Sequence, residues 1–227
     1  MNQALLRRLR SELKRVADPE KAQAMQKYMK SAMPYHGVSA PLVRRVFRKV
    51  FADSDFVDAD SWRNTVLYIW RNARFREEWY AAVALCESGK AKAFQTPDAL
   101  PMYEEIIVTA AWWDIVDAIA SHSVGLLLRR HPRVIGKEMR LWSRSENIWK
   151  RRTSILCQLG FKENTDLKLL YECIEPSLGS TQFFLRKAIG WALRQYAWTN
   201  AGEVRRYVRL NEKRLSPLSK REALKNI

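Results

Sequence analysis

Pairs of aromatic or bulky residues recur at nearly constant intervals along this chain of 227 residues. The intervals are 33, 36 and 35 residues, and each pair precedes a run of small or aliphatic residues such as AAVAL or KAIGWAL. The pairs are Trp79-Tyr80, Trp112-Trp113, Ile148-Trp149 and Phe183-Phe184. A unit of this length cannot bury its apolar face alone, so successive units must stack, as in helical repeats of the HEAT or armadillo kind. The recurrence predicts a superhelical solenoid of HEAT-like antiparallel helix pairs, with an irregular helical bundle as the alternative.

The composition favours helices throughout the chain. Glycine and proline number only 8 each, and the sequence has no glycine-rich phosphate loop and no nucleophile elbow. Helix-start signals recur, with a capping residue or a proline in the first turn. These signals are Asp18-Pro19, Ser39 before Pro41, Thr96-Pro97, Ser145-Glu146, Ser180 and the capping box from Ser219 to Glu222. We therefore expect an all-α chain that forms a single HEAT-like repeat domain over residues 1–227.

The charge balance points to a polyanionic partner. The chain carries 40 Lys and Arg against 24 Asp and Glu, a formal net charge of +16. A basic protein gains affinity for nucleic acid because each phosphate that it neutralises releases counterions. Nucleic acid is therefore the first expectation, and a merely basic surface is the alternative.

Cysteine and histidine usage excludes several other classes. Cys86, Cys157 and Cys173 are scattered, and the three histidines show no ligand spacing with them. The sequence has neither a signal-peptide core nor a long uncharged apolar stretch. We expect no metal, no cofactor and no membrane partner, and a cytoplasmic protein that is nucleoid-associated when bound to DNA.

The repeat places a set of functional side chains on one face. Asp117, Arg152 and Lys187 follow one another at intervals of 35 residues, so they occupy equivalent positions of successive units. Trp113 stands one helical turn before Asp117, Trp191 stands one turn after Lys187, and Arg194 lies a further turn along. Such a face could hold a sugar-phosphate backbone, with cations on the phosphates and aromatic rings on sugars or bases.

The acid on this face has two interpretations. A lone carboxylate would repel phosphates, so its presence on this face suggests a catalytic role. Alternatively, Asp117 neutralises Arg152 in an ion pair between repeats, and Asp114 is a solvated or capping acid. Packing is also the first expectation for four of the nine tryptophans, Trp70, Trp79, Trp112 and Trp142.

Four segments carry a resemblance to a known family. They read EEIIVTAAWWDIVDAIA, SENIWKRRTSILCQL, FFLRKAIGWALRQYA and LSPLSKREALKNI. In these segments the chain closely resembles the AlkD-type DNA alkylation repair family, the HEAT-like alkylpurine DNA glycosylases. The similarity of order and spacing runs through the whole chain from DPEKAQAMQKYMK onwards.

The resemblance implies a superhelical stack that holds duplex DNA and hydrolyses the N-glycosidic bond of alkylated purines while the base stays stacked. In that family the catalytic aspartate falls on Asp117 and its flanking tryptophans on Trp113 and Trp191. The family's arginine that binds the DNA backbone falls on Arg152, and a further DNA-contacting tyrosine falls on Tyr28. Arg44 also fits the family pattern. The expected partner is duplex DNA containing alkylated purines, bound by a monomer.

Two functions follow as hypotheses. The first is a monofunctional glycosylase for cationic N3- and N7-alkylated purines, in which Asp117 stabilises an oxocarbenium-like sugar and positions water. A cationic base leaves without being protonated, which suits a face with no evident general acid. The second is a noncatalytic DNA- or RNA-binding HEAT-like solenoid in which Asp117 is structural.

Overall fold

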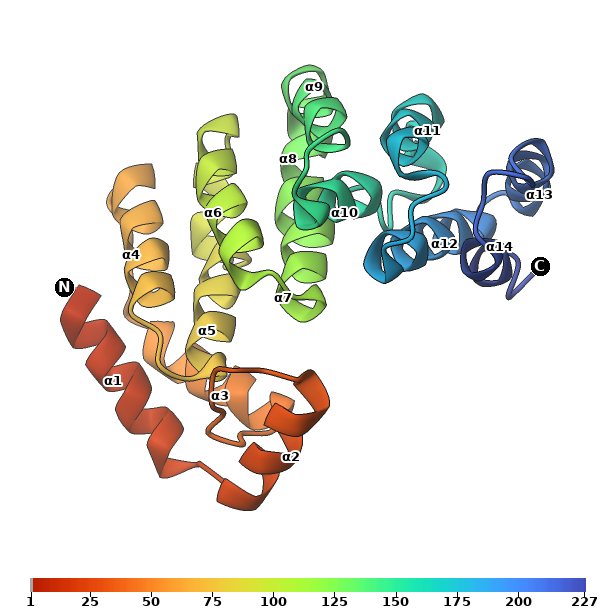
Figure 1. The fold of residues 1–227 in the computed structure, drawn as a ribbon. Coiled ribbons are helices and arrows are strands. Elements are labelled where there is room, and N and C mark those ends of the chain that lie inside the picture. The colour runs from red at the N-terminus through yellow and green to blue at the C-terminus, as the bar shows by residue number, and fades with distance from the viewer. Residues whose placement is uncertain (1) are drawn as a thin grey trace. The chain divides into compact units, whose positions relative to one another are not determined.

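The computed structural model describes residues 2–227, and within that range every regular element is a helix (Figure 1). The prediction of an all-α chain is therefore confirmed. The chain forms two compact units, an N-terminal unit that ends at Phe94 and a C-terminal unit over Gln95–Ile227. The expectation of one repeat domain over residues 1–227 stays a prediction, and Met1 lies outside the described residues.

The described part of the N-terminal unit, residues 2–94, contains five α-helices and a short 3₁₀ helix. They are α1 (Asn2–Arg15), α2 (Pro19–Met29), α3 (Ala40–Phe51), α4 (Ala59–Arg71), α5 (Arg76–Cys86) and η1 (Gly89–Phe94). α1 buries Leu6, Leu9 and Leu13 at helical spacing, and α1 packs against α3 while α4 packs against α5. Asp18 caps α2 by accepting a hydrogen bond from the Lys21 N–H, with Pro19 in the first turn, as the sequence predicted.

A buried acid fixes the connection between α2 and α3. Glu77 of α5 is fully buried, and its carboxylate accepts the N–H groups of His36, Gly37 and Val38 at 2.9, 3.0 and 3.2 Å. Gly37 has a φ of +80°, and a Cβ there would lie 2.0 Å from the Asp18 carbonyl oxygen. The loop therefore requires glycine at this position.

The C-terminal unit contains nine α-helices, a π-helix and three short 3₁₀ helices. They are η2 (Pro97–Ala99), α6 (Leu100–Ala110), α7 (Trp113–Ala118), the π-helix η3 (Ile119–Val124), α8 (Gly125–Arg130), α9 (Pro132–Trp142), α10 (Ile148–Leu156), η4 (Lys162–Asn164), α11 (Leu167–Ile174), η5 (Glu175–Ser177), α12 (Phe183–Ala197), α13 (Ala201–Leu210) and α14 (Pro217–Ala223).

Helix pairs stack within this unit. α10 packs against α12 and α12 packs against α14, while α9 packs against α11, so the pairs α9 and α10, α11 and α12, and α13 and α14 follow one another (Figure 1). The first residues of α7, α10 and α12 are Trp113, Ile148 and Phe183, which are 35 residues apart in both steps. The predicted repeat therefore corresponds to real helix starts.

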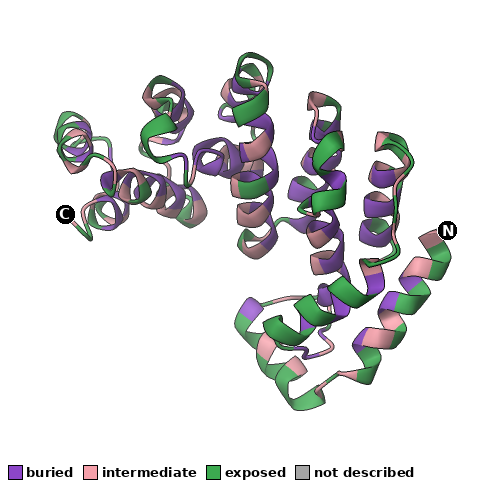
Figure 2. Cartoon of the chain, turned by 180° about the vertical axis from the view of Figure 1, so that it is seen from behind, coloured by how far each residue is buried: buried purple, intermediate pink, exposed green. Residues whose placement is uncertain are grey.

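Apolar residues between the helices form the core of the C-terminal unit. The cluster draws on α10, α11, α12, α13 and α14, and Leu156, Leu185 and Leu193 are among its members with no exposed surface. In Figure 2 the buried residues gather on the sides of the helices that turn toward their neighbours. The four tryptophans expected in packing do pack; for example, the rings of Trp70 and Trp79 stack with centroids 4.5 Å apart.

Three expected helix starts are wrong. α10 begins at Ile148 with Asn147 as its cap, and α12 begins at Phe183, so Ser145 and Ser180 lie in the preceding turns. The capping box proposed at Ser219 does not form, because Ser216 caps α14 and Pro217 occupies its first position. A serine followed by proline is itself a helix-start signal, and here it prevails over the later one.

No helix within residues 2–227 has the length and apolar character needed to cross a membrane.

Candidate active site

Asp117 of α7 and Arg152 of α10 form a bidentate ion pair. Arg152 Nε donates to Asp117 Oδ1 at 2.6 Å, and Nη2 donates to Oδ2 at 2.7 Å. Arg152 Nη1 also donates to the Phe184 carbonyl oxygen of α12 at 2.5 Å. The Arg152 and Asp117 side chains are only 4% and 14% exposed. Arg152 therefore joins three helices, and the ion pair between repeats that was one of the two interpretations of Asp117 is present.

The backbone around Asp117 is unusual on both sides. Ala111, just before α7, adopts a left-handed conformation with a φ of 45°, and α7 then runs directly into the π-helix η3. Ser121 of η3 donates its hydroxyl to the Asp117 carbonyl oxygen at 2.7 Å. Single-turn π segments are frequent at functional sites. η3 could not be predicted, since no periodicity in the sequence marks such a change of hydrogen-bonding pattern.

Burial and pairing act in opposite directions on the Asp117 carboxyl. Removal from water raises its pKa above the ordinary value, and the hydrogen bonds and charge of Arg152 partly oppose that rise. Burial is the larger effect, so this carboxylate takes up a proton more readily than a surface aspartate does.

Adjacent tryptophans at the start of α7 have different surroundings. Trp112 packs with Trp149 and Phe184, at centroid distances of 6.3 and 5.4 Å, and belongs to an aromatic cluster beside Arg152. Trp113 is 36% exposed. Trp191 of α12 is partly buried against the core of the C-terminal unit. Trp112 is therefore a packing residue, as expected, while Trp113 is partly exposed.

Lys187 and Arg194 are engaged by an acid that the sequence analysis missed. Glu222 of α14 bonds Lys187 Nζ at 2.8 Å and Arg194 Nη1 at 2.7 Å, and its side chain is only 10% exposed. The Lys187 hydrogen bond, followed by the charges of Lys187 and Arg194, lowers the pKa of Glu222 despite its burial. Glu222 lies 35 residues after Lys187, so one further step of the same period would have found it. The predicted row of charges thus contains three ion pairs, one between Asp117 and Arg152 and two that Glu222 makes with Lys187 and Arg194.

The two remaining predicted DNA contacts belong to the N-terminal unit. Tyr28 lies on α2 and is 77% exposed. Arg44 lies on α3, is exposed, and makes no hydrogen bond or ion pair with any residue in the range 2–227.

Glu104, a carboxylic side chain of the kind that acts as a general acid, is ion-paired. Glu104 of α6 bonds Lys150 Nζ at 2.5 Å, and the same ammonium lies 5.1 Å from the ring centroid of Trp142. Glu104 is therefore engaged by a cation of α10.

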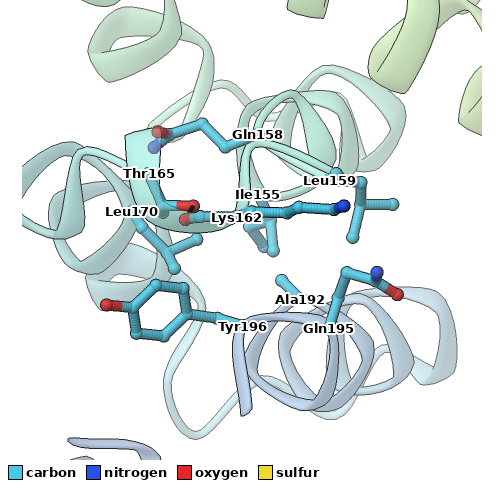
Figure 3. Close-up of a pocket in the computed structure, with 10 residues that line it drawn as sticks. Ile155, Gln158, Leu159, Lys162, Thr165, Leu170, Ala192, Gln195 and Tyr196 are labelled. Atoms are coloured by element: carbon cyan, nitrogen blue, oxygen red, sulfur yellow. Dashed lines mark hydrogen bonds between the residues drawn. The ribbon is translucent and has the colours of Figure 1, made fainter. Parts of the chain in front are cut away.

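A small cavity lies elsewhere in the C-terminal unit. It has a volume of about 20 Å³ and is lined by residues of α10, η4, α11 and α12, including Ile155, Lys162, Leu170 and Tyr196 (Figure 3). This space suffices for about one water molecule. Neither Asp117 nor Arg152 is among its lining residues.

Comparisons with known proteins agree with the helical repeat. The family model described as DNA alkylation repair enzyme matches residues 9–227. Among solved structures, one described as a predicted DNA alkylation repair enzyme from Enterococcus faecalis is 29% identical in sequence, with a TM-score of 0.84. That match covers 93% of this chain and 96% of the other. A search of curated proteins finds no match. Since the family model spans nearly the whole chain, this protein belongs to the DNA alkylation repair enzyme family.

Proposed function

We propose that this protein is a monofunctional DNA glycosylase that hydrolyses the N-glycosidic bond of N3- and N7-alkylated purines in duplex DNA. The observation that carries the proposal is a carboxylate, Asp117, which two hydrogen bonds from Arg152 hold in place in a chain of net charge +16. Membership of a DNA alkylation repair family supports the same substrate.

The reaction begins with departure of the base. The bond between C1′ and N9 breaks, and its electron pair moves to the purine, which neutralises the positive charge of the alkylated base. The deoxyribose becomes oxocarbenium-like, and the charge of Asp117 stabilises that cation. No general acid is needed, because the leaving group departs neutral without receiving a proton.

Water then completes the hydrolysis. Its oxygen bonds to C1′, and its proton passes to Asp117, whose raised pKa makes it a better base than an ordinary aspartate. We assign the rings of Trp113 and Trp191 to contact with the deoxyribose, where their negative π faces favour a sugar that becomes cationic. The partial exposure of Trp113 supports this assignment.

Arg152 is assigned to a backbone phosphate near the lesion. Its guanidinium group has five N–H donors. The bonds to Asp117 and to the Phe184 carbonyl oxygen use three of them, one on each nitrogen. Two donors are not used by these bonds, and because the side chain is only 4% exposed, a phosphate contact with Asp117 still paired is confined to that accessible edge.

The second candidate is a noncatalytic DNA- or RNA-binding protein. The observation in its favour is that Arg152 occupies both oxygens of Asp117, so a purely structural ion pair would also account for this acid. The two candidates differ in one assay, the release of free N7-methylguanine from methylated duplex DNA. The glycosylase releases the base with multiple turnovers, whereas the noncatalytic protein binds the duplex and leaves the base attached.

A further inference from the structure

α7, η3 and α8 follow one another without a break, and α7 and η3 pack against α10 (Figure 1). The segment that they form meets α10 at two points. Asp117 bonds Arg152 at the first point. Gly125, eight residues after Asp117, lies beside the carbonyl oxygen of Cys157, the residue that caps the end of α10. The Asp117 carboxylate and the Gly125 backbone therefore face the same neighbouring helix.

The π-helix η3 explains how two residues eight positions apart share one side. In a regular α-helix each residue turns the chain by about 100°, so eight residues would rotate Gly125 about 80° away from Asp117. A π-turn closes on the fifth residue back and so holds one residue more. Gly125 shows this pattern, because its N–H bonds the Ala120 carbonyl oxygen. The extra residue brings the eight residues to about two turns, which places Asp117 and Gly125 on one side.

Gly125 allows an unusually close approach to α10. A Cβ added there would lie 2.7 Å from the Cys157 carbonyl oxygen. That oxygen belongs to the backbone, so it cannot rotate aside as a flexible side chain could. The φ of Gly125 is −59°, an ordinary helical value, so the close approach and not the backbone conformation requires glycine. A larger residue must push η3 and α8 away from α10.

The ion pair of Asp117 is sensitive to such a movement. Within residues 2–227, Arg152 alone bonds the Asp117 carboxylate, through two bonds of 2.6 and 2.7 Å. A bidentate pair of this kind has a specific geometry, in which both N–H groups must point at the two oxygens at once. A small displacement of η3 and α8 from α10 therefore weakens the pair.

We propose that Gly125 is a positioning residue, which holds the Asp117 carboxylate in register with Arg152 through the contact between α8 and the end of α10. Gly125 has no side chain that could take part in the reaction, and it acts through the backbone of η3. The proposal rests on the proposed function in that Asp117 is the catalytic carboxylate. It adds a residue whose effect on the reaction is made entirely through another.

The test compares Gly125→Ala with Gly136→Ala, a matched replacement inside α9. A Cβ at Gly136 would come nearest to Arg140 Nη1, at 3.3 Å, which is the end of a flexible side chain. Alanine is the better helix former, so both variants should fold. In each protein, with and without Arg152→Gln, carbon-13 NMR titration gives the pKa of the Asp117 carboxyl. Single-turnover kinetics give the rate of N7-methylguanine release, and fluorescence anisotropy gives the affinity for the duplex.

The two variants should differ in how Asp117 responds to Arg152. In wild type, Arg152→Gln should raise the pKa of Asp117, because Arg152 lowers it. In Gly125→Ala the same replacement should change this pKa much less, since the contact is already weakened. The release rate of Gly125→Ala should fall by about 10-fold or more, while its affinity for the duplex stays within about 3-fold of wild type. Gly136→Ala should match wild type in all three measurements.

Three results would overturn the proposal. The first is an undiminished effect of Arg152→Gln in the Gly125→Ala protein. The second is the same set of losses in Gly136→Ala, since the contact with Cys157 would then have no special part. The third is a Gly125→Ala protein that circular dichroism shows to be unfolded, because Gly125 would then be needed for stability and not for position.

Failure of the proposed function gives a different pattern, because the NMR titration needs no DNA. If wild type releases no alkylated base but Gly125→Ala loses the effect of Arg152→Gln, the glycosylase is wrong and the positioning of Asp117 stands. If wild type releases the base and Gly125→Ala keeps both that effect and the rate, the reverse holds.

Discussion

At the scale of single residues, Asp117 is the acid on which the proposed chemistry depends. We predict that Asp117→Asn lowers the single-turnover rate of N7-methylguanine release by about 10²-fold or more, because the amide lacks the charge that stabilises the sugar cation. The buried Arg152 also loses its counter-charge, so the thermal stability should fall while the fold survives at 25 °C. Asp114→Asn, the same replacement in the same helix, should retain most of the rate.

The rates of these two variants decide between the interpretations of Asp117. If Asp117→Asn folds, binds the duplex and releases the base as fast as wild type, the carboxylate is structural. If Asp114→Asn is the slower variant, the assignment within α7 is wrong.

The pKa of Asp117 gives a second prediction at this scale. Burial raises it, so protonation should remove the active carboxylate at a pH above the ordinary aspartate range near about 4. Excision should therefore fall as the pH decreases through this raised value. Arg152 lowers the pKa, so Arg152→Gln should move the acid limb of the pH–rate profile to higher pH. An acid limb at the same pH in both proteins would contradict the role given to Asp117.

At the scale of helices, the contact between α12 and α14 holds the segment that carries Trp191. A Cβ added at Gly190 would lie 2.5 Å from the Glu222 Cβ and 2.9 Å from the Ser219 carbonyl oxygen. We predict that Gly190→Ala forces the helices apart and lowers the free energy of unfolding by about 1 to 3 kcal/mol. Thermal and urea denaturation measure this change.

Gly202→Ala provides the matched control for this contact. In α13 the added Cβ would meet only the Asn200 Oδ1, at 3.5 Å, which is an ordinary contact. Alanine is also the better helix former, so this variant should be as stable as wild type or more stable by up to about 1 kcal/mol. Equal stability of the two variants would show that α14 does not press on α12 at Gly190.

The helices also show how much of the fold and of the candidate site the sequence could predict. The recurring bulky pairs coincide with the starts of α7, α10 and α12, whereas the capping signals at Ser145 and Ser180 placed two of these starts too early. The 35-residue period placed Asp117 and Arg152 at equivalent positions, because that feature repeats. It did not predict that Lys187 is bonded to Glu222. The same period reaches Glu222 one step beyond Lys187, but the bond also depends on how closely α14 approaches α12 at Gly190, which the period does not give.

The roles of site residues outside the repeat were predicted from the family resemblance alone. Tyr28 and Arg44 stand in α2 and α3, where no period links them to Asp117. Their exposure is compatible with DNA contact, and their roles stay predictions. The π-helix η3 lay beyond sequence reasoning, since it inserts a wider turn without a change in the hydrophobic pattern.

At the scale of the whole molecule, the proposed chemistry limits which lesions are removed. Because the proposed reaction uses no general acid, we expect it to depend on leaving groups that arrive positively charged. Duplexes with N7-methylguanine or a bulkier cationic N7 adduct should therefore release their base, whereas hypoxanthine should stay attached. Chromatography of the released bases measures this selectivity. Efficient hypoxanthine release would mean that an acid acts on the leaving group.

The central claim is most directly tested with a duplex that carries a single N7-methylguanine. The protein is incubated with this duplex and with an undamaged one, and mass spectrometry follows the free base and the DNA strands. The account predicts free N7-methylguanine, an abasic strand that stays intact until alkaline treatment, and little release when Asp117→Asn replaces the wild type. A damaged duplex that is bound by the wild-type protein but keeps its base, at the rate of spontaneous loss, would contradict it.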